Sequence, residues 1–294
     1  MNLQNIVNKY LKSIKFSIKQ KTYLFYLQLS EIYISKFKSQ LSNLNLNLYV
    51  SRLRDNYAYS TVKSIKSLIN RSLEFATQEG IIRENIKISV KLTNTQVRKV
   101  NALDKSEQNK LTTYILTTKK SYHLGLLLSM LTGLRLGELL ALKWCNVDIK
   151  NRIIFVEKTI GVISQNHKNL LIEDIPKTQS SIREIPISKQ LLLLLKEQKV
   201  KSKSEYVVSN YKGEQVNPRA YQKSFENLLK KLNIKHYGFH SLRHTFATRL
   251  LEKNVDIKTI SELMGHSSPT ITLNRYVHTN MQNKRKAMEV FNKN

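Results

Sequence analysis

Residues 240–276, HSLRHTFATRLLEKNVDIKTISELMGHSSPTITLNRY, are the stretch around which the rest of the sequence is organised. They contain two histidines, His240 and His266, and an arginine, Arg243, three positions after the first histidine. A tyrosine, Tyr276, follows ten positions after the second histidine. A phosphate diester is attacked most easily when cations hold its oxygens, a base is near and a nucleophile points at phosphorus. One short stretch supplies all three residue types.

The spacing of apolar residues predicts three short helices in this stretch. Residues 240–251 have apolar side chains at helical spacing, and residues 256–264 form a second such run that Gly265 ends. Pro269 suits the first position of a third helix, which carries the tyrosine. The first histidine and the arginine lie one turn apart near the start of the first helix, where backbone N–H groups and the helix dipole favour an anion.

The composition indicates a polyanionic partner. The chain has 294 residues, 41% of them hydrophobic, which suits one large or two ordinary domains with a real core. It carries 49 Lys and Arg against 21 Asp and Glu, a net charge of +28, and a Lys-rich proteome accounts for only part of that excess. Residues 1–94 and the remainder are both basic, which favours a clamp with two nucleic-acid-facing parts.

Several classes of protein are excluded or disfavoured. The single cysteine, Cys145, permits no intrachain disulfide and no Cys-rich zinc site. No apolar run reaches 18 residues and no signal-peptide core opens the chain, so we expect a cytoplasmic protein without a membrane partner. The sequence also lacks a carboxylate cluster for two-metal nuclease chemistry and a GxxxxGK[ST] phosphate loop.

The fold class is predicted to be mostly α with a small antiparallel β-sheet. Residues 1–94 show only helical periodicity, which predicts a small all-helical N-terminal domain. Its aromatic stripe in residues 21–39 is interpreted as helix-bundle core rather than a base-stacking surface. Residues 95–103 are polar, basic and aperiodic, and are the expected linker. Residues 104–294 then form a mixed α+β domain with a C-terminal tail.

The β-sheet is predicted from four runs in the second domain. Residues 153–156, 161–164, 170–175 and 182–187 are rich in β-formers and separated by polar turns. Lys177 lies in the turn between the last two runs, where a hairpin tip could carry it into a groove. An isolated lysine in a turn is usually only a solvated charge. Lys177 is therefore a candidate site residue only because it belongs to the ordered set described below.

Arg135 occupies an unusual place between two strongly apolar segments, just after a glycine break. Glu138 is three residues later and shares its helix face. A surface ion pair is the default interpretation of such a pair, but a charge is rarely set among apolar residues without a reason. The ordered set of Arg135, Lys177, His-x-x-Arg, Gly-His and Tyr is specific, although each member alone is not.

This ordered set resembles the tyrosine recombinase, or phage integrase, family. The matching motifs are TGLRLGELLALKW, PKTQSSIREIPI, HSLRHTFATRLLE and LMGHSSPTITLNRYVH, in that order. The resemblance covers about residues 100–280. Residues 1–94 resemble the family's helical core-binding domain only in size, position and helical pattern. The resemblance therefore implies a DNA-clamping N-terminal domain and a catalytic domain of the tyrosine recombinase type.

The resemblance implies a role for each matched residue. Arg135 and Arg243 would grip the non-bridging phosphate oxygens, a bidentate task that lysine cannot perform. Glu138 would orient the site around Arg135 from a second layer of residues.

The remaining catalytic residues follow from the same resemblance. Lys177 would protonate the departing 5′ oxygen, and His240 would assist removal of the tyrosine proton. His266 would hydrogen-bond the phosphate or the nucleophile. Tyr276 would be the nucleophile and form a 3′-phosphotyrosyl link. The family uses no metal and no cofactor, because the arginines and the lysine stabilise the developing charge.

The family also implies the partners and the reaction. These are double-stranded DNA recombination sites, a homotetramer on DNA that passes through a Holliday junction, and possible accessory DNA-bending or directionality proteins. The segment after Tyr276 would dock on the next subunit. The chain begins with the helical domain, a layout expected of Xer-like recombinases that resolve DNA multimers and of short integrases of mobile elements. The sequence does not distinguish between these two biological roles.

Two other functions are compatible with part of this pattern. A type IB topoisomerase shares the phosphotyrosine chemistry but relaxes supercoils without exchanging partners. The two-domain size and the extension past Tyr276 favour a recombinase over it. A non-catalytic DNA-binding protein would carry the same charge, and the complete catalytic set argues against it.

Overall fold

The computed structural model describes residues 2–93, 101–118, 120–165, 168–176 and 179–276. The chain divides into two compact units, Met1–Arg98 and Lys99–Asn294, which are described separately below. The predicted fold class is confirmed, since both units consist mainly of helices and the second adds small antiparallel sheets. The predicted ends of the first domain and the linker, at residues 94 and 103, stay predictions. None of the described helices is long and apolar enough to cross a membrane.

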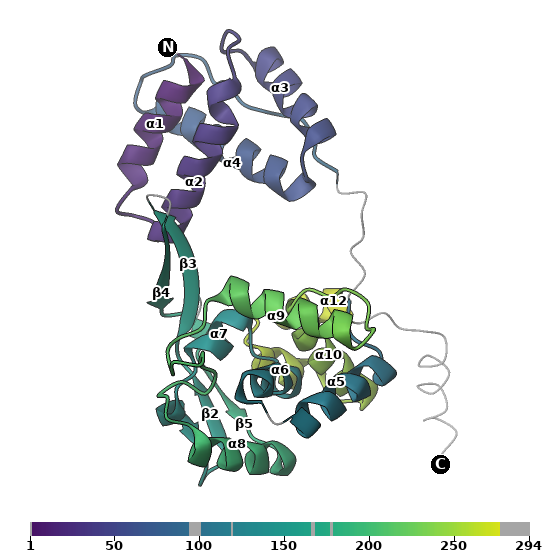
Figure 1. Cartoon of the computed structure of the whole chain (residues 1–294). Coiled ribbons are helices and arrows are strands. Elements are labelled where there is room, and N and C mark those ends of the chain that lie inside the picture. The colour runs from purple at the N-terminus through teal and green to yellow at the C-terminus, as the bar shows by residue number, and fades with distance from the viewer. Residues whose placement is uncertain (1, 94–100, 119, 166–167, 177–178, 277–294) are drawn as a thin grey trace, which may run out of the picture. The chain divides into compact units, whose positions relative to one another are not determined.

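The first unit is a bundle of four α-helices, shown in purple and blue in Figure 1. Helix α1 packs against α4 and α2, and α3 packs against α4. The helices are α1 (Leu3–Ile14), α2 (Gln20–Ile32), α3 (Asn43–Asn56) and α4 (Tyr59–Gln78), with a short 3-10 turn, η1 (Ile34–Lys36), after α2.

Local signals explain where these helices begin and end. The Asn2 side chain accepts a hydrogen bond from the backbone N–H of Asn5 at 2.9 Å and so caps α1. The predicted helix over residues 21–39 ends instead at Ile32, and the chain continues as the 3-10 turn. Leu29 and Phe37 of the predicted stripe are buried, but Ile32 is 41% exposed, so the stripe is core only in part.

The second unit surrounds one buried helix, α6, with the other helices and the sheets. Residues 124–130 of α6 are mostly apolar and are all buried. The helices are α5 (Lys105–Thr118), α6 (Ser121–Thr132), α7 (Leu136–Ala141), α8 (Lys189–Lys201), α9 (Pro218–Lys231), α10 (His240–Glu252), α11 (Ile257–Met264) and α12 (Pro269–Tyr276). Short 3-10 turns are η2 (Trp144–Asn146) and η3 (Gln179–Ser181).

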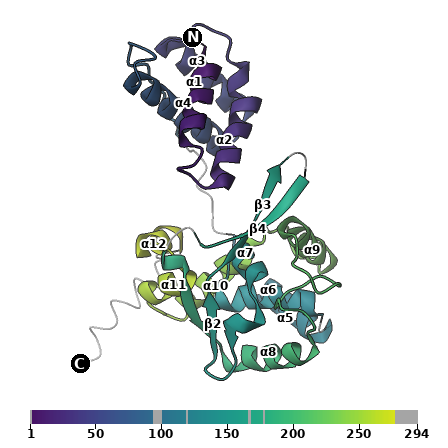
Figure 2. The same ribbon diagram turned by 90° about the vertical axis from the view of Figure 1, so that its left-hand side faces the viewer.

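The strands form two antiparallel sheets rather than the single predicted sheet. One has the order β1-β2-β5, from β1 (Val147–Asp148), β2 (Ile153–Val156) and β5 (Arg183–Pro186). The other is a ribbon of β3 (Thr159–Gln165) and β4 (Lys168–Asp174), which Figure 2 shows projecting from the rest of this unit. The strands before and after the Lys177 turn thus belong to different sheets, since β4 pairs with β3 and β5 pairs with β2. Lys177 itself lies outside the described residues.

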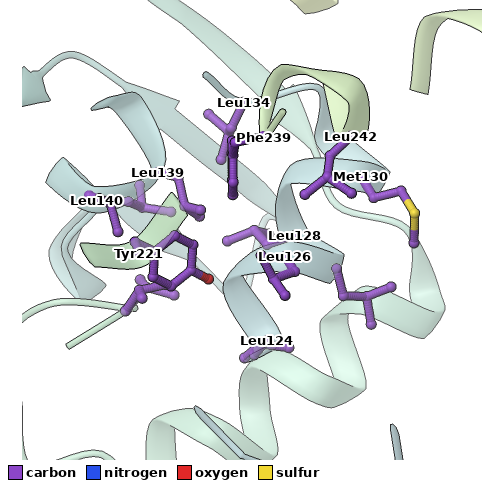
Figure 3. Packing of buried hydrophobic residues seen from close by; sticks show 14 of the residues in the cluster. Leu124, Leu126, Leu128, Met130, Leu134, Leu139, Leu140, Tyr221, Phe239 and Leu242 are labelled. Carbon is purple, nitrogen blue, oxygen red and sulfur yellow. The ribbon is translucent and has the colours of Figure 1, made fainter. Parts of the chain in front are cut away.

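The core of the second unit is centred on α6, and Figure 3 shows part of it. Leu126 and Leu128 of α6 lie among side chains of α7, α9 and α10, including Leu139, Tyr221 and Leu242. At the end of α6, Gly133 has φ +70°, and a Cβ there would lie 2.6 Å from the Phe246 ring. Glycine is therefore required where the chain turns from α6 towards Arg135.

Helix α10 contacts a second, smaller apolar cluster on its other side. Phe246 and Ala247 of α10 pack against Ile260 and Met264 of α11. This packing fixes the C-terminal end of α11 beside α10. Two of the predicted catalytic residues, Arg135 and Arg243, meet at that end.

Candidate active site

The C-terminal end of α11 is the centre of the candidate site. Gly265 ends the helix in the left-handed conformation, with φ 61° and ψ 50°. The last carbonyls of a helix have no partner within it, and the helix dipole makes that end attractive to cations. Three consecutive carbonyl groups here, from residues 263 to 265, each accept a hydrogen bond from a different arginine.

Two of these arginines are the predicted phosphate-binding pair. Arg135 Nη2 donates to the Gly265 carbonyl oxygen at 2.8 Å. Arg243 Nη2 donates to the Met264 carbonyl oxygen, and its Nη1 donates to the Gly133 carbonyl oxygen at 2.6 Å. The two guanidinium groups, 108 positions apart in sequence, are therefore held on adjacent carbonyls.

The two arginines differ in their access to solvent. The Arg135 side chain is 32% exposed, so a phosphate can approach it directly. Arg243 is only 1% exposed.

The third arginine, Arg183, was given no role by the sequence analysis. It lies at the start of β5, and its Nε donates to the Leu263 carbonyl oxygen at 2.7 Å. Its Nη2 lies 2.9 Å from Glu138 Oε2. In β5 it shares a face with the buried Ile185. A charged residue on the core face of a strand is the sequence signal that could have identified it.

Glu138 joins two of the arginines. Its Oε1 accepts from Arg135 Nη1 at 2.6 Å, and its Oε2 accepts from the Arg135 backbone N–H at 3.0 Å. Burial raises the pKa of the Glu138 carboxyl, but the charges and hydrogen bonds of Arg183 and Arg135 outweigh burial and leave that pKa below its ordinary value. The carboxylate, 2% exposed, is therefore ionised at neutral pH. The prediction that Glu138 shares a face with Arg135 is confirmed.

The histidines lie at the ends of α10 and α11. His240 is the exposed first residue of α10, and its ring centroid is 4.9 Å from that of His244 in a T-shaped arrangement. Two backbone N–H groups at this end, of Ser241 and Leu242, already donate to the carbonyls of residues 238 and 239. The predicted anion-binding capacity of the helix start is therefore partly used within the chain.

His266 connects α11 to α12. Its Nδ1 is hydrogen-bonded to Thr272 Oγ1 at 2.8 Å, and Thr272 is fully buried. Tyr276 is the last residue of α12, one helical turn after Thr272, and its side chain lies outside the described residues. Lys177 also lies outside them. The roles of both residues therefore remain predictions.

Comparison with known proteins identifies the family. Residues 91–283 match the model of the phage integrase family. The chain belongs to that family. A tyrosine recombinase XerC-like protein of Caldanaerobacter subterraneus subsp. tengcongensis is 30% identical over 295 residues, covering 92% of this chain and 75% of that protein. The transposase from transposon Tn916 of Enterococcus faecalis is 27% identical over 265 residues, covering 82% of this chain and 64% of that protein.

Solved structures of this phage integrase family share the fold. The Tn1549 transposon integrase, in complex with circular intermediate DNA, superimposes with a TM-score of 0.84 at 23% identity, over 99% of this chain and 100% of that one. A lambda integrase tetramer bound to a Holliday junction gives 0.71 at 20% identity, over 94% of this chain and 78% of that one. The family match and the XerC-like relative show that this chain is a tyrosine site-specific recombinase.

The described residues contain no group of three or more His, Cys, Asp or Glu side chains that could hold a metal ion. The expectation that the recombinase needs neither a metal nor a cofactor stays a prediction. The arginines supply positive charge of their own at the site.

Proposed function

We propose that this recombinase cuts and rejoins DNA strands through a 3′-phosphotyrosyl intermediate, and exchanges them through a Holliday junction. The observation that carries the proposal is the meeting of Arg135 and Arg243 on neighbouring carbonyls of one helix end, next to His266. Two guanidiniums side by side stabilise the charge that grows on the equatorial oxygens of a pentacoordinate phosphorus.

The proposed chemical step balances without an external energy source. The Tyr276 hydroxyl oxygen attacks phosphorus, and a new phosphorus–oxygen bond forms to the protein. The bond from phosphorus to the 5′ oxygen breaks, and Lys177 gives that oxygen a proton. His240 assists removal of the tyrosine proton. Because one ester replaces another, the bond energy is kept for the reverse attack that rejoins the strands.

The hydrogen bond between His266 and Thr272 supports the assignment of Tyr276. It connects the arginine-bearing helix end to the helix that ends at the tyrosine. A displacement of α12 along this contact would change the distance between nucleophile and phosphate. His266 is therefore proposed to hold α12 in register as well as to hydrogen-bond the phosphate or the nucleophile.

A nicked duplex that traps the covalent intermediate tests the proposal. Wild-type protein should form a covalent protein–DNA adduct, and Tyr276→Phe should bind the same DNA without forming any. Tyr211→Phe is the matched control, because Tyr211 is 93% exposed in a turn of the same unit, and its adduct yield should equal that of wild type. An undiminished adduct in Tyr276→Phe would show that another residue is the nucleophile.

The biological reaction is proposed to be recombination between two DNA sites by a homotetramer, integrating or excising a mobile element or resolving DNA multimers. Its work on DNA is proposed to take place in the cytoplasm, with accessory DNA-bending or directionality proteins where the sites require them. Joining of strands from two different duplexes distinguishes this recombinase from a type IB topoisomerase. Relaxation of supercoils without such products would favour the topoisomerase activity.

A further inference from the structure

Arg183 makes contacts that no catalytic assignment uses. Its guanidinium donates to three acceptors, Glu138 Oε2 at 2.9 Å and the carbonyl oxygens of Leu263 at 2.7 Å and Ser181 at 3.1 Å. The side chain is only 6% exposed. All three nitrogens of its guanidinium donate within the protein, so we assign it no phosphate contact, and any effect it has on the reaction passes through another residue.

The residue it acts through is Glu138. That carboxylate is shared between Arg183 and the predicted phosphate-binding Arg135, and both its oxygens are occupied. A carboxylate paired with Arg135 alone would neutralise the charge that Arg135 offers to a phosphate. With two arginines around one carboxylate, the three side chains together keep one net positive charge.

A ring of contacts joins Arg183 to Arg135 by a second route. Arg183 holds the Leu263 carbonyl, and Arg135 holds the carbonyl of Gly265 two residues later on the same helix end. Arg183 of β5 and Arg135 at the start of α7 thus both bind the C-terminal end of α11, and both also contact the Glu138 carboxylate. A shift of Arg183 changes both the partner of Glu138 and the position of the carbonyl that anchors Arg135.

We propose that Arg183 is a positioning residue of this recombinase, which offsets the charge of Glu138 and thereby leaves the positive charge of Arg135 available to the scissile phosphate. The assignment rests on the proposed function, in which Arg135 binds that phosphate. It predicts a defect in the chemical step and not in DNA binding. It also predicts that the defect depends on the presence of the Glu138 carboxylate.

Single-turnover cleavage of the nicked duplex at saturating full-length protein tests the assignment. Arg183→Gln should lower the rate about tenfold to a hundredfold, less than the 10²- to 10³-fold loss typical of removing a donor that touches the reacting group directly. The dissociation constant for the same DNA should change by less than about twofold, because all three nitrogens of the Arg183 guanidinium donate within the protein. Arg152→Gln, at an exposed arginine in the turn between β1 and β2, is the control and should cleave as wild type does.

A double-mutant cycle separates charge compensation from a purely structural role. In the Glu138→Gln background, Arg183→Gln should change the rate by less than about threefold, because no carboxylate remains to be offset. If Arg183→Gln slows the reaction equally in both backgrounds, charge compensation is wrong. An unchanged rate in the single variant Arg183→Gln would overturn the assignment completely.

Arg183→Lys keeps the experiment decisive if the glutamine variant does not fold. Lysine retains the charge but cannot donate to Glu138 and to both carbonyls at once. The cleavage rate of Arg183→Lys should lie between the rates of wild type and Arg183→Gln. If Arg183→Gln does not fold, the rate of Arg183→Lys should still be measurable and lower than that of wild type. A lysine variant that is folded, by near-UV circular dichroism, and cleaves at an intermediate or wild-type rate supports the charge role of Arg183. A lysine variant that is folded and inactive overturns it.

An activity-independent measurement distinguishes failure of this assignment from failure of the proposed function. The Nε–H resonance of Arg135 in a ¹⁵N-correlated spectrum reports its guanidinium contacts without DNA. It should shift in Arg183→Gln and Arg183→Lys but not in Arg152→Gln. If wild-type protein forms no adduct, the proposed function fails, and an unshifted resonance in the Arg183 variants would overturn the link between Arg183 and Arg135 by itself.

Discussion

Replacement of Gly265 by alanine tests whether the end of α11 is the centre of the site. Gly265 has φ +61°, a conformation that costs an alanine about 1 to 2 kcal/mol. The added Cβ would also lie 2.9 Å from both the Ser180 carbonyl oxygen and Arg183 Nη1. The carbonyl belongs to the backbone and cannot rotate away, so overpacking adds about 1 to 3 kcal/mol. The total is a loss of about 2 to 5 kcal/mol in the free energy of unfolding.

Gly213→Ala provides the matched control for Gly265→Ala. Gly213 also has positive φ, +82°, but the nearest atom to its added Cβ is 3.8 Å away, so this variant carries the backbone strain without the close contacts. One kcal/mol shifts Tm by about 2 to 4 °C in a unit of this size. Differential scanning calorimetry should therefore show Gly265→Ala melting at least about 2 °C below Gly213→Ala.

The two glycine variants should differ more in catalysis than in stability. A backbone shift at residue 265 moves the carbonyl that anchors Arg135, and displacement of a reacting group by 1 Å can cost about 10²-fold in rate. Covalent adduct formation by Gly265→Ala should fall about tenfold or more at a temperature where the protein is folded. Gly213→Ala should retain the wild-type rate. Equal melting temperatures and equal rates for the two variants would refute the reasoning.

A buried hydrogen bond, the Glu138 carboxyl and the net charge of the chain can each be tested separately. Thr245 Oγ1 accepts from the buried Leu103 N–H at 2.9 Å, so Thr245→Val should cost about 1 to 3 kcal/mol in chemical denaturation, whereas Thr248→Val, half-exposed on the same helix, should cost little. Because the folded pKa of Glu138 is lowered, its contribution to stability is present above its unfolded pKa, about 4.3, and is lost as pH falls through the folded value; acid titration of Glu138→Gln should be less steep below that pH, and identical curves would contradict this. The net charge of +28 implies many phosphate contacts, so log affinity for DNA should fall with log salt with a slope of about −5 or steeper, and a flat response would argue against DNA as the partner.

Much of the helical architecture could be predicted because its signals are local. A few neighbouring residues are enough to recognise the apolar run of α6, the glycine that ends α11 and the proline that begins α12. The 3-10 turn after Ile32 was not predicted, because the apolar spacing continues across it. The two-residue strand β1 was missed because a pair of residues has no period.

The pairing of strands could not be predicted from the same signals. Four β-rich runs were found, but their division between two sheets depends on contacts between distant segments. Strand β2 pairs with β5, while the chain between them folds back on itself as the β3–β4 ribbon. An alternating pattern shows which face of a strand is buried and does not show which strand lies beside it.

The candidate site was predicted in its residue types but not in its geometry. Order along the chain and resemblance to a family selected Arg135, Glu138 and Arg243, and the structure brings them together at α11. The carbonyls that bind these arginines could not be predicted, since every residue has a backbone oxygen and the sequence does not show which of them accepts a hydrogen bond. Arg183 was missed because the two partners that tie it to the site, Glu138 and the Leu263 carbonyl, lie 45 and 80 positions away in the sequence.

The choice of a helix C-terminus as the centre of an anion-binding site has a physical reason. A helix N-terminus binds a phosphate directly, but it offers a fixed set of backbone donors. A C-terminus attracts cations, so it can hold guanidinium groups in place before any phosphate arrives. Three buried or half-buried arginines in one place would repel one another strongly.

Here three carbonyls, the partial negative charge of the helix end and one carboxylate offset that repulsion without cancelling it. The site therefore remains positive and ordered on its own, and the phosphate of the DNA supplies the charge that it lacks. That inference predicts that removing one cation, at Arg183, disturbs the site less if the Glu138 carboxylate is removed with it.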